Sequence, residues 1–358
     1  MSELTLSPAR VMTGRVRRAG WDRLSHGLHV VRDRTLTDEL RAWSQVLPPH
    51  TAFTHLTAAE YRGWWLPAAI PHPVFAAGTV TDQHRRPGLY VCRHPEPGPH
   101  QFLDGLRITT AAETLLACAR DLGVLDLVIM ADSALRLGHC TLTELKLAAR
   151  PRRRGAPLLR SILPLLDPRS ESPWESTMRV LHRAAGIPVS PQHEVYDATG
   201  RLLARADLWV VGTRRLHEYD GAVHRLGEVH GNDLRRDRRL SRAGWTRYGF
   251  TSTDVLTGGG AIVAECDRLL GRPPDPGRVR AWNDLVETSL YGRQGRARAY
   301  RRWSRWQSES AHREIRAGTT TSPGPLSPGP LSPGHSPWTK PPDQTPEGAI
   351  EVSRRITP

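Results

Sequence analysis

The stretch Leu202–His224 reads LLARADLWVVGTRRLHEYDGAVH, and its pattern decides the fold of the surrounding region. Two apolar-rich runs, Leu202–Val211 and Arg214–Tyr219, flank the pair Gly212-Thr213. Such runs around a short glycine-containing pair are typical of a β-hairpin, because glycine readily adopts the positive φ of a tight turn. The stretch therefore predicts two antiparallel strands joined by a short loop.

The register of this hairpin brings acidic side chains together. A loop of two residues, or of four, places Asp207 opposite Glu218 and Arg205 opposite Asp220, whereas an odd loop breaks the pairing. Because side chains alternate along strands, we expect all three carboxylates to share one face. Opposed like charges destabilise a sheet, so the patch requires raised pKa values or a cation. A hard divalent ion such as Mg²⁺ fits, with Asp207, Glu218 and Asp220 as its ligands.

A fourth carboxylate, Glu175, lies upstream on a helix predicted to begin at Ser172-Pro173 and to end near Gly186. Its spacing from Ser172 matches a capping box, in which the two side chains bond to each other's backbone. Two interpretations of Glu175 therefore stay open. It either caps the helix or contributes to the acidic site.

The order of these residues resembles that of the PD-(D/E)xK nuclease superfamily, and more narrowly its branch related to very-short-patch-repair endonucleases. Glu218–His224 reads E-x-D-G-x-x-H, Asp233–Arg236 reads D-L-R-R, and Leu240–Trp245 ends in Gly-Trp. The resemblance covers roughly residues 170–257. It implies a restriction-endonuclease-like mixed sheet flanked by helices, within an α/β chain.

The resemblance also implies a function, namely hydrolysis of phosphodiester bonds in DNA with Mg²⁺ or Mn²⁺ as cofactor. In such a site the ion is held by acidic residues of the hairpin, and a glutamate at the position of Glu175 assists. His224 would accept a proton from the attacking water or contact the phosphate, unless it is an ordinary surface residue. The arginines expected to position the DNA backbone are Arg205, Arg235 and Arg236.

One departure from the superfamily bears on activity. Its usual lysine is missing from this region, and Asp220 stands in that position. In the very-short-patch-repair branch, acidic and histidine groups take over the role of the lysine. A chain that kept the fold and lost the activity is the alternative interpretation.

Residues 1–150 are predicted to form an α+β domain that resembles AbiEi-type antitoxin proteins. Gly20–Val30 reads as the β-hairpin wing of a winged helix, and Thr54–Pro67, THLTAAEYRGWWLP, resembles the middle region of those proteins. Only a short segment precedes the wing, so we expect the DNA-reading helix of the winged-helix module to be missing or vestigial. This resemblance supports the rival function of a non-catalytic DNA-binding regulator or antitoxin.

Helix starts in the N-terminal half are predicted from Thr-x-x-Glu capping boxes. These boxes are Thr57–Glu60, Thr110–Glu113 and Thr141–Glu144. Asp126 and Asp132 fall on the predicted helices, where we expect them to be exposed or to cap a helix end.

The C-terminal half is divided by composition. Residues 151–170 read as a basic linker and a helix, 171–272 as the nuclease-like domain, 273–317 as a basic helical extension and 318–358 as a disordered Pro/Gly/Ser tail. The extension is predicted to contain one helix over Trp282–Arg316. Its interleaved Arg and Trp indicate either stacking on single strands or docking on the protein.

A two-domain division of this kind implies that a fragment starting near Ala156 folds by itself. The formal net charge of +14 favours polyanionic partners, although only two of the basic residues are lysines, which indicates codon bias. The sequence contains no run of about 20 apolar residues, so we expect no membrane-spanning segment. Four scattered cysteines fit neither a zinc motif nor a disulfide framework, so we expect a cytoplasmic protein.

Overall fold

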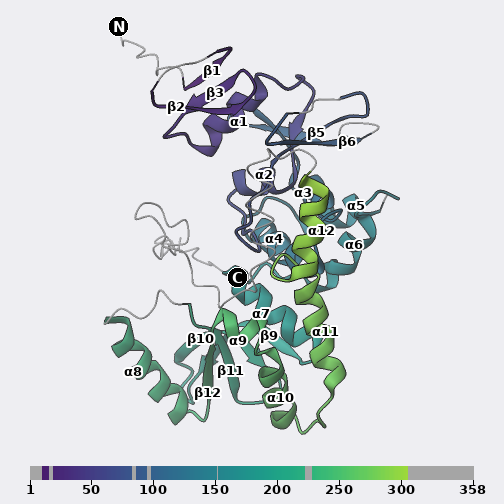
Figure 1. Cartoon of the computed structure of the whole chain (residues 1–358). Coiled ribbons are helices and arrows are strands. Elements are labelled where there is room, and N and C mark those ends of the chain that lie inside the picture. Colours follow the sequence, from purple (N-terminus) through teal and green to yellow (C-terminus); the bar gives the residue numbers. More distant parts are fainter. Residues whose placement is uncertain are drawn as a thin grey trace, which may run out of the picture. The chain divides into compact units, whose positions relative to one another are not determined.

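A computed structural model describes residues 10–15, 19–82, 86–94, 98–150, 152–221 and 228–304; for 228–234 it describes the backbone alone. The chain is a mixed α/β protein that contains a three-stranded, a four-stranded and a five-stranded sheet flanked by helices (Figure 1). The expected α/β class is therefore confirmed at this level. The predicted tail at 318–358 lies outside the described residues.

The N-terminal sheet contains β1 (Val11–Thr13), β2 (Trp21–Ser25) and β3 (Leu28–Val31), in the order β1-β3-β2. The antiparallel pair β2–β3 is the predicted hairpin, and Gly27 in its turn has a φ of 65°. Helix α1 (Leu36–Ser44) follows, and the side chain of Thr35 caps it through a full capping box.

A five-stranded mixed sheet comes next. Its strands are β4 (Ala52–Phe53), β5 (Val74–Thr79), β6 (Leu89–His94), β7 (His100–Leu103) and β8 (Leu106–Thr109), in the order β6-β5-β4-β8-β7. Helix α2 (His55–Tyr61) connects β4 to β5. The predicted helix start at Thr57 is wrong, because α2 begins two residues earlier and the Thr57 hydroxyl instead accepts a hydrogen bond from the amide of Phe75.

Four α-helices then precede the second half of the chain. They are α3 (Ala111–Cys118), α4 (Val124–Arg136), α5 (Leu142–Ala149) and α6 (Ala156–Ile162), followed by a 3-10 turn at Leu163–Leu165. The predicted capping box of Thr141 forms. That of Thr110 does not, because the carboxylate of Glu113 pairs with Arg153 from the predicted linker.

The four-stranded sheet carries the region of the nuclease resemblance. Helix α7 (Pro173–Ala184) leads into β9 (Val189–Tyr196), β10 (Leu202–Val210) and β11 (Arg215–Tyr219), and α8 (Glu228–Arg242) leads into β12 (Thr246–Phe250). The strand order is β12-β11-β10-β9, with β11–β12 parallel and the other pairs antiparallel. Leu240 of α8 packs against Leu216 on one face, whereas α7 packs with Leu208 and Val210 on the other.

The described part of the chain continues with four further helices, α9 (Ser252–Leu256), α10 (Gly259–Leu269), α11 (Pro276–Glu287) and α12 (Arg293–Trp303). The predicted single helix over Trp282–Arg316 is wrong, since α11 ends at Glu287 and the backbone turns sharply before Gly292. A Cβ at Gly292 would lie 2.4 Å from the backbone of Glu287, so only glycine fits this turn. Trp282 and Trp303 are both fully buried, which favours docking over base stacking.

One hydrophobic core runs through both halves of the chain. It includes Leu115 and Leu127 from the predicted first domain, Met178 and Leu181 from α7, and Trp303 from α12. The predicted boundary near residue 150 therefore does not coincide with a break in the core. None of the helices in the described residues is long and apolar enough to cross a membrane.

Candidate metal and nucleic-acid site

The β10–β11 hairpin has the predicted register. Leu208 pairs with His217, Trp209 with Leu216 and Val210 with Arg215, which makes Asp207 and Glu218 the next residues on the two strands. The loop between the last pair has four residues, 211–214, and this even length preserves the pairing expected for a two-residue loop. Gly212 in the loop has a φ of 85°.

Asp207 lies where the two strands stop pairing. Its Oδ2 accepts a hydrogen bond of 2.9 Å from the amide of Tyr219, so the side chain occupies a position that a backbone carbonyl holds elsewhere in a ladder. Burial, together with the negative charges of Glu175 and Glu218, raises the pKa of Asp207 to about 8. The surroundings of this carboxyl group therefore disfavour its ionised form.

Glu175 is buried beside Asp207 and is only partly explained by capping. Ser172 accepts a hydrogen bond from the Glu175 amide, as in a capping box. The carboxylate, however, accepts bonds from the Glu171 amide at 2.7 Å and from the Gln192 side chain at 2.8 Å. Burial raises its pKa. Glu175 and Asp207 thus each accept hydrogen bonds, the charge of Glu175 acts on Asp207, and neither carboxylate is ion-paired with a cation among the described residues.

Two neighbours fix this arrangement. Gln192 on β9 has a φ of 51°, which is uncommon for a residue other than glycine and marks a constrained backbone. Trp174 on α7 stacks on Tyr219, with ring centroids 5.2 Å apart and an angle of 10° between the planes. The stack holds the first turn of α7 against the end of β11, so that Glu175 approaches Asp207.

Glu218 is already neutralised by two arginines. Arg236 on α8 contacts both of its carboxylate oxygens, and Arg247 on β12 donates a hydrogen bond of 2.9 Å to Oε2. Arg247 also binds Asp237 through two hydrogen bonds. The predicted metal ligand Glu218 therefore belongs to an ion-pair network, and Arg236, predicted to position DNA, faces this network.

The remaining predicted residues lie around the edge of the site. Asp220 is exposed, and its side chain lies close to Gly249 of β12. Arg205 is also exposed and pairs with Glu171, which precedes α7. His224 lies outside the described residues, so its predicted role stays a prediction.

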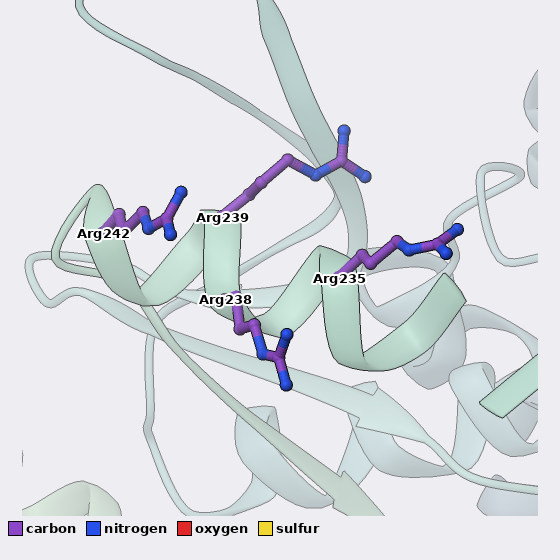
Figure 2. Close-up of a pocket in the computed structure, with 4 residues that line it drawn as sticks. All are labelled: Arg235, Arg238, Arg239 and Arg242. Carbon is purple, nitrogen blue, oxygen red and sulfur yellow. The ribbon is translucent and has the colours of Figure 1, made fainter. Parts of the chain in front are cut away.

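Helix α8 carries a row of exposed arginines, which we call the arginine face. It consists of Arg235, Arg238, Arg239 and Arg242, whose spacing follows adjacent turns of the helix. Figure 2 shows their guanidinium groups extending from the helix, and together they line a hollow of about 510 Å³. Of the three arginines predicted to contact DNA, Arg235 is part of this face.

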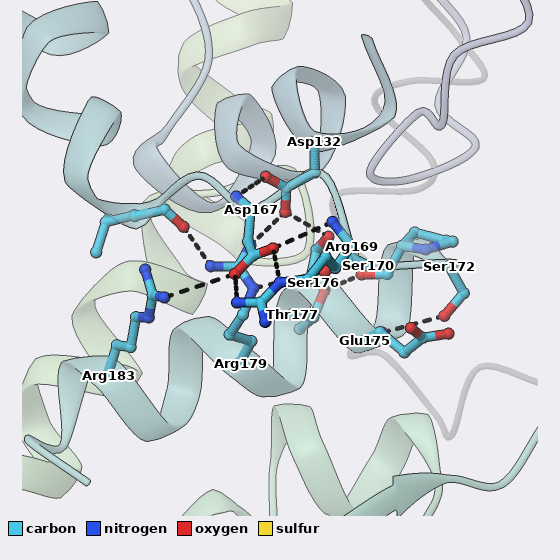
Figure 3. A network of polar contacts seen from close by, with 12 residues as sticks. Asp132, Asp167, Arg169, Ser170, Ser172, Glu175, Ser176, Thr177, Arg179 and Arg183 are labelled. Carbon is cyan, nitrogen blue, oxygen red and sulfur yellow. Dashed lines mark hydrogen bonds and ion pairs between the residues drawn. The ribbon is translucent and has the colours of Figure 1, made fainter. Parts of the chain in front are cut away.

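A buried ion pair anchors the helix that carries Glu175 (Figure 3). Arg179 of α7 contacts Asp132 of α4, and both side chains are fully excluded from solvent. Asp132 also accepts hydrogen bonds from Ser176 at 2.6 Å and from the amide of Asp167 at 2.8 Å. The expectation that Asp132 is exposed or capping is therefore wrong. Asp126 caps α4 as expected but is also fully buried.

Sequence reasoning missed a second polar cluster, on the opposite side of β11 from Glu218. His182, His217 and Cys266 are fully buried, and one ligand atom of each lies within 4.8 Å of the other two. Burial lowers the pKa of His182 to about 3 and also lowers that of His217. Alternation along β11 correctly placed His217 on the other face, but the partners come from distant helices that no local pattern identifies.

Comparison with known proteins gives two relatives. The chain is 26% identical over 261 residues to an uncharacterized protein of Mycobacterium tuberculosis strain CDC 1551 / Oshkosh, and equally to one of strain ATCC 25618 / H37Rv. Each alignment covers 72% of this chain and 95% of the relative. No family model and no solved structure matches the chain.

Proposed function

We propose that this protein is a metal-dependent nuclease that hydrolyses phosphodiester bonds in DNA. The mixed sheet β9–β12, with α7 and α8 on its two faces, is compatible with the restriction-endonuclease-like fold that the sequence resemblance implies. The four free cysteines are buried, which is consistent with a reducing, cytoplasmic location.

The observation that carries the proposal is the uncompensated pair of carboxylates, Glu175 and Asp207. The charge of Glu175 raises the cost of ionising Asp207, and Arg236, whose charge acts on Asp207, is bound to Glu218. A divalent cation with a preference for oxygen ligands would stabilise both charges. The residues present therefore fit Mg²⁺ or Mn²⁺, with Asp207 and Glu175 as the best-placed ligands and exposed Asp220 as a further oxygen donor.

The role of Glu218 differs from the expected one. With Arg236 and Arg247 bound to its oxygens, it orients two guanidinium groups beside the carboxylate pair. Positive charge there would face the phosphate of a bound substrate and stabilise the charge that develops during cleavage. The bound ion itself would polarise the phosphate and lower the pKa of a coordinated water.

The arginine face on α8 supplies the second element of the proposal. Exposed guanidinium groups can bind the phosphates of a nucleic-acid backbone, and such contacts position a substrate without reading its bases. Arg238, Arg239 and Arg242 are exposed for this role, and the same helix turns Arg236 inward toward Glu218. Helix α8 thus connects the binding surface to the acidic site.

Cleavage and binding measured on one variant test this function. The wild type should nick supercoiled plasmid only with Mg²⁺ or Mn²⁺, and Asp207→Asn should abolish nicking while DNA binding stays close to normal. Glu194→Gln, an exposed carboxylate on neighbouring β9, is the matched control and should cleave like the wild type. Cleavage by Asp207→Asn at the wild-type rate would rule out the proposed site.

A non-catalytic DNA-binding regulator is the second candidate, and one observation favours it. Both carboxylate oxygens of Glu218 are bound by arginines, which leaves fewer free oxygens for a metal than the sequence suggests. In that case the wild type should bind DNA with no cleavage of single-stranded, duplex, branched or mismatched substrates. Asp207→Asn should then bind DNA equally well or more tightly, because a repulsive negative charge is removed.

A further inference from the structure

The cluster behind β11 joins three separate elements. His182 belongs to α7, His217 to β11 and Cys266 to α10, and all three side chains are fully buried. The cluster lies on the face of the sheet that packs against α7, away from the arginines of Glu218. It is thus separate from the proposed catalytic site, although β11 contributes to both.

The two histidines form a chain of three polar contacts that ends in an acceptor on each side. His182 Nδ1 lies 2.7 Å from the carbonyl oxygen of Met178, and His182 Nε2 lies 2.9 Å from His217 Nδ1. His217 Nε2 lies 3.4 Å from Oε2 of Glu265 and is a buried nitrogen without a hydrogen-bond partner among the described residues. Arg215 lies 2.9 Å from the other oxygen of Glu265.

Two neutral imidazoles leave one of these three contacts without a proton. Each neutral ring carries one proton, so two protons are available for three contacts, and both outer partners are acceptors. Any choice of tautomers leaves one lone pair opposed to another acceptor. If both rings donate outward, two nitrogen lone pairs face each other at 2.9 Å. A third proton would place an imidazolium in a fully buried site, which desolvation disfavours.

A metal ion between the inner nitrogens removes this conflict. The outer N–H groups would then donate to a carbonyl and a carboxylate, which is the usual surrounding of a metal-bound histidine. The sulfur of Cys266 supplies a third ligand from α10. Zn–N bonds of about 2.0–2.1 Å in a tetrahedral site separate two nitrogens by about 3.3 Å, so the rings need to move apart by only a few tenths of an ångström.

We propose that His182, His217 and Cys266 bind a zinc ion that fastens α7, β11 and α10 together. Imidazole nitrogens and a thiolate suit Zn²⁺ and exclude Mg²⁺, which prefers oxygen ligands. The ion is structural, because its ligands are enclosed by the core. The ion would bind β11 on the face of the sheet that packs against α7. Glu218, on the opposite face of the same strand, faces α8.

Metal analysis of the full-length protein tests the site directly. Protein purified with Zn²⁺ present and then desalted should retain one zinc per chain, and Co²⁺ in place of Zn²⁺ should give the charge-transfer absorption of a cobalt–thiolate bond. Cys266→Ala should lose the metal and the absorption. Cys118→Ala is the matched control, because Cys118 is equally buried in the same core but lies in α3.

Two results would overturn the proposal. One is a folded wild type that retains no zinc and gives no cobalt–thiolate absorption. In that case a buried histidinium would supply the third proton for the contacts of His182 and His217. The other is unchanged metal content in Cys266→Ala and His217→Gln. If a variant does not fold, the cobalt spectrum of the wild type decides alone. Excess Mg²⁺ should displace no zinc, which keeps this test independent of the proposed nuclease activity.

Discussion

Arg179 of α7 and Asp132 of α4 form an ion pair in which neither side chain has any contact with solvent. Ser176 and the Asp167 amide complete the hydrogen bonding of the carboxylate, and the Leu165 carbonyl accepts a further bond from the guanidinium. The pair fixes the helix that carries Glu175 to the N-terminal half of the chain. The position of the candidate site is thus determined partly by residues outside its own sheet.

Removing one partner of this pair should destabilise the protein strongly. Arg179→Met leaves Asp132 buried without its counter-charge, and the expected loss in the free energy of unfolding is about 3–5 kcal/mol. Urea denaturation measures it. The control is Arg169→Gln, which breaks the more exposed pair with Asp167 and should cost less than about 1 kcal/mol. Equal losses in both variants would show that the buried pair has no special role.

Asp207→Asn should change how stability depends on pH. The pKa of Asp207 is raised to about 8 in the folded protein, against about 3.9 in an unfolded chain. Between these values the folded state binds the extra proton, so the wild type loses stability as pH rises, by up to about 1.4 kcal/mol per pH unit. The Asp207→Asn variant should not lose stability in this way over the same pH range.

Urea denaturation in EDTA across this pH window measures the effect, and Glu194→Gln should keep the wild-type dependence. Mg²⁺ should flatten the wild-type curve, because a bound cation favours the ionised carboxylate. Parallel curves for wild type and Asp207→Asn would mean that Asp207 has an ordinary pKa.

The arginine face should account for much of the salt dependence of DNA binding. Replacing Arg238 and Arg242 with Gln should weaken binding evenly across sequences and reduce the slope of log K against log salt by about 1 for each phosphate that is no longer bound. Fluorescence anisotropy at several salt concentrations measures this slope. Arg268→Gln, an exposed arginine on α10, should leave it unchanged. A slope unaffected by the double variant would place the DNA elsewhere.

A fragment of residues 156–304 should not fold alone, contrary to the division expected from the sequence. It would lack Asp132 and would expose the apolar residues of α7 and α12 that pack with the N-terminal half. Near-ultraviolet circular dichroism and the cooperativity of urea unfolding test this prediction. A sharp unfolding transition for the fragment would restore the boundary near residue 150.

Local patterns predicted the features that depend on few residues. The β10–β11 register followed from alternation and an even loop length, and the Thr141 capping box formed because the exposed carboxylate of Glu144 bonds back to Thr141. Glu113 had the same spacing, yet Arg153 bound its carboxylate. A motif of four residues cannot reveal a partner that only the tertiary fold brings near.

The acidic site shows the same limit. Asp207 and Glu175 were proposed from the hairpin and the resemblance, and in the structure the charge of Glu175 acts on Asp207. Arg247 was not predicted, because it lies far from Glu218 along the chain. The two residues meet only because α8 connects β11 to the parallel strand β12. Gln192 was not predicted because its unusual backbone follows from packing, with no glycine to mark it. The cluster of His182, His217 and Cys266 was not predicted, because its residues come from three separate elements.

The burial of Trp303 has a consequence for how the chain is made. Its ring contacts Phe75 edge-on at 5.3 Å between centroids, and its indole N–H donates to Asp121 at 3.0 Å. A ribosome delivers the N-terminal half first, so Phe75 and Asp121 emerge long before the residue that covers them. During synthesis this surface stays open, and nascent chains shorter than about 303 residues are expected to depend on chaperones until α12 arrives.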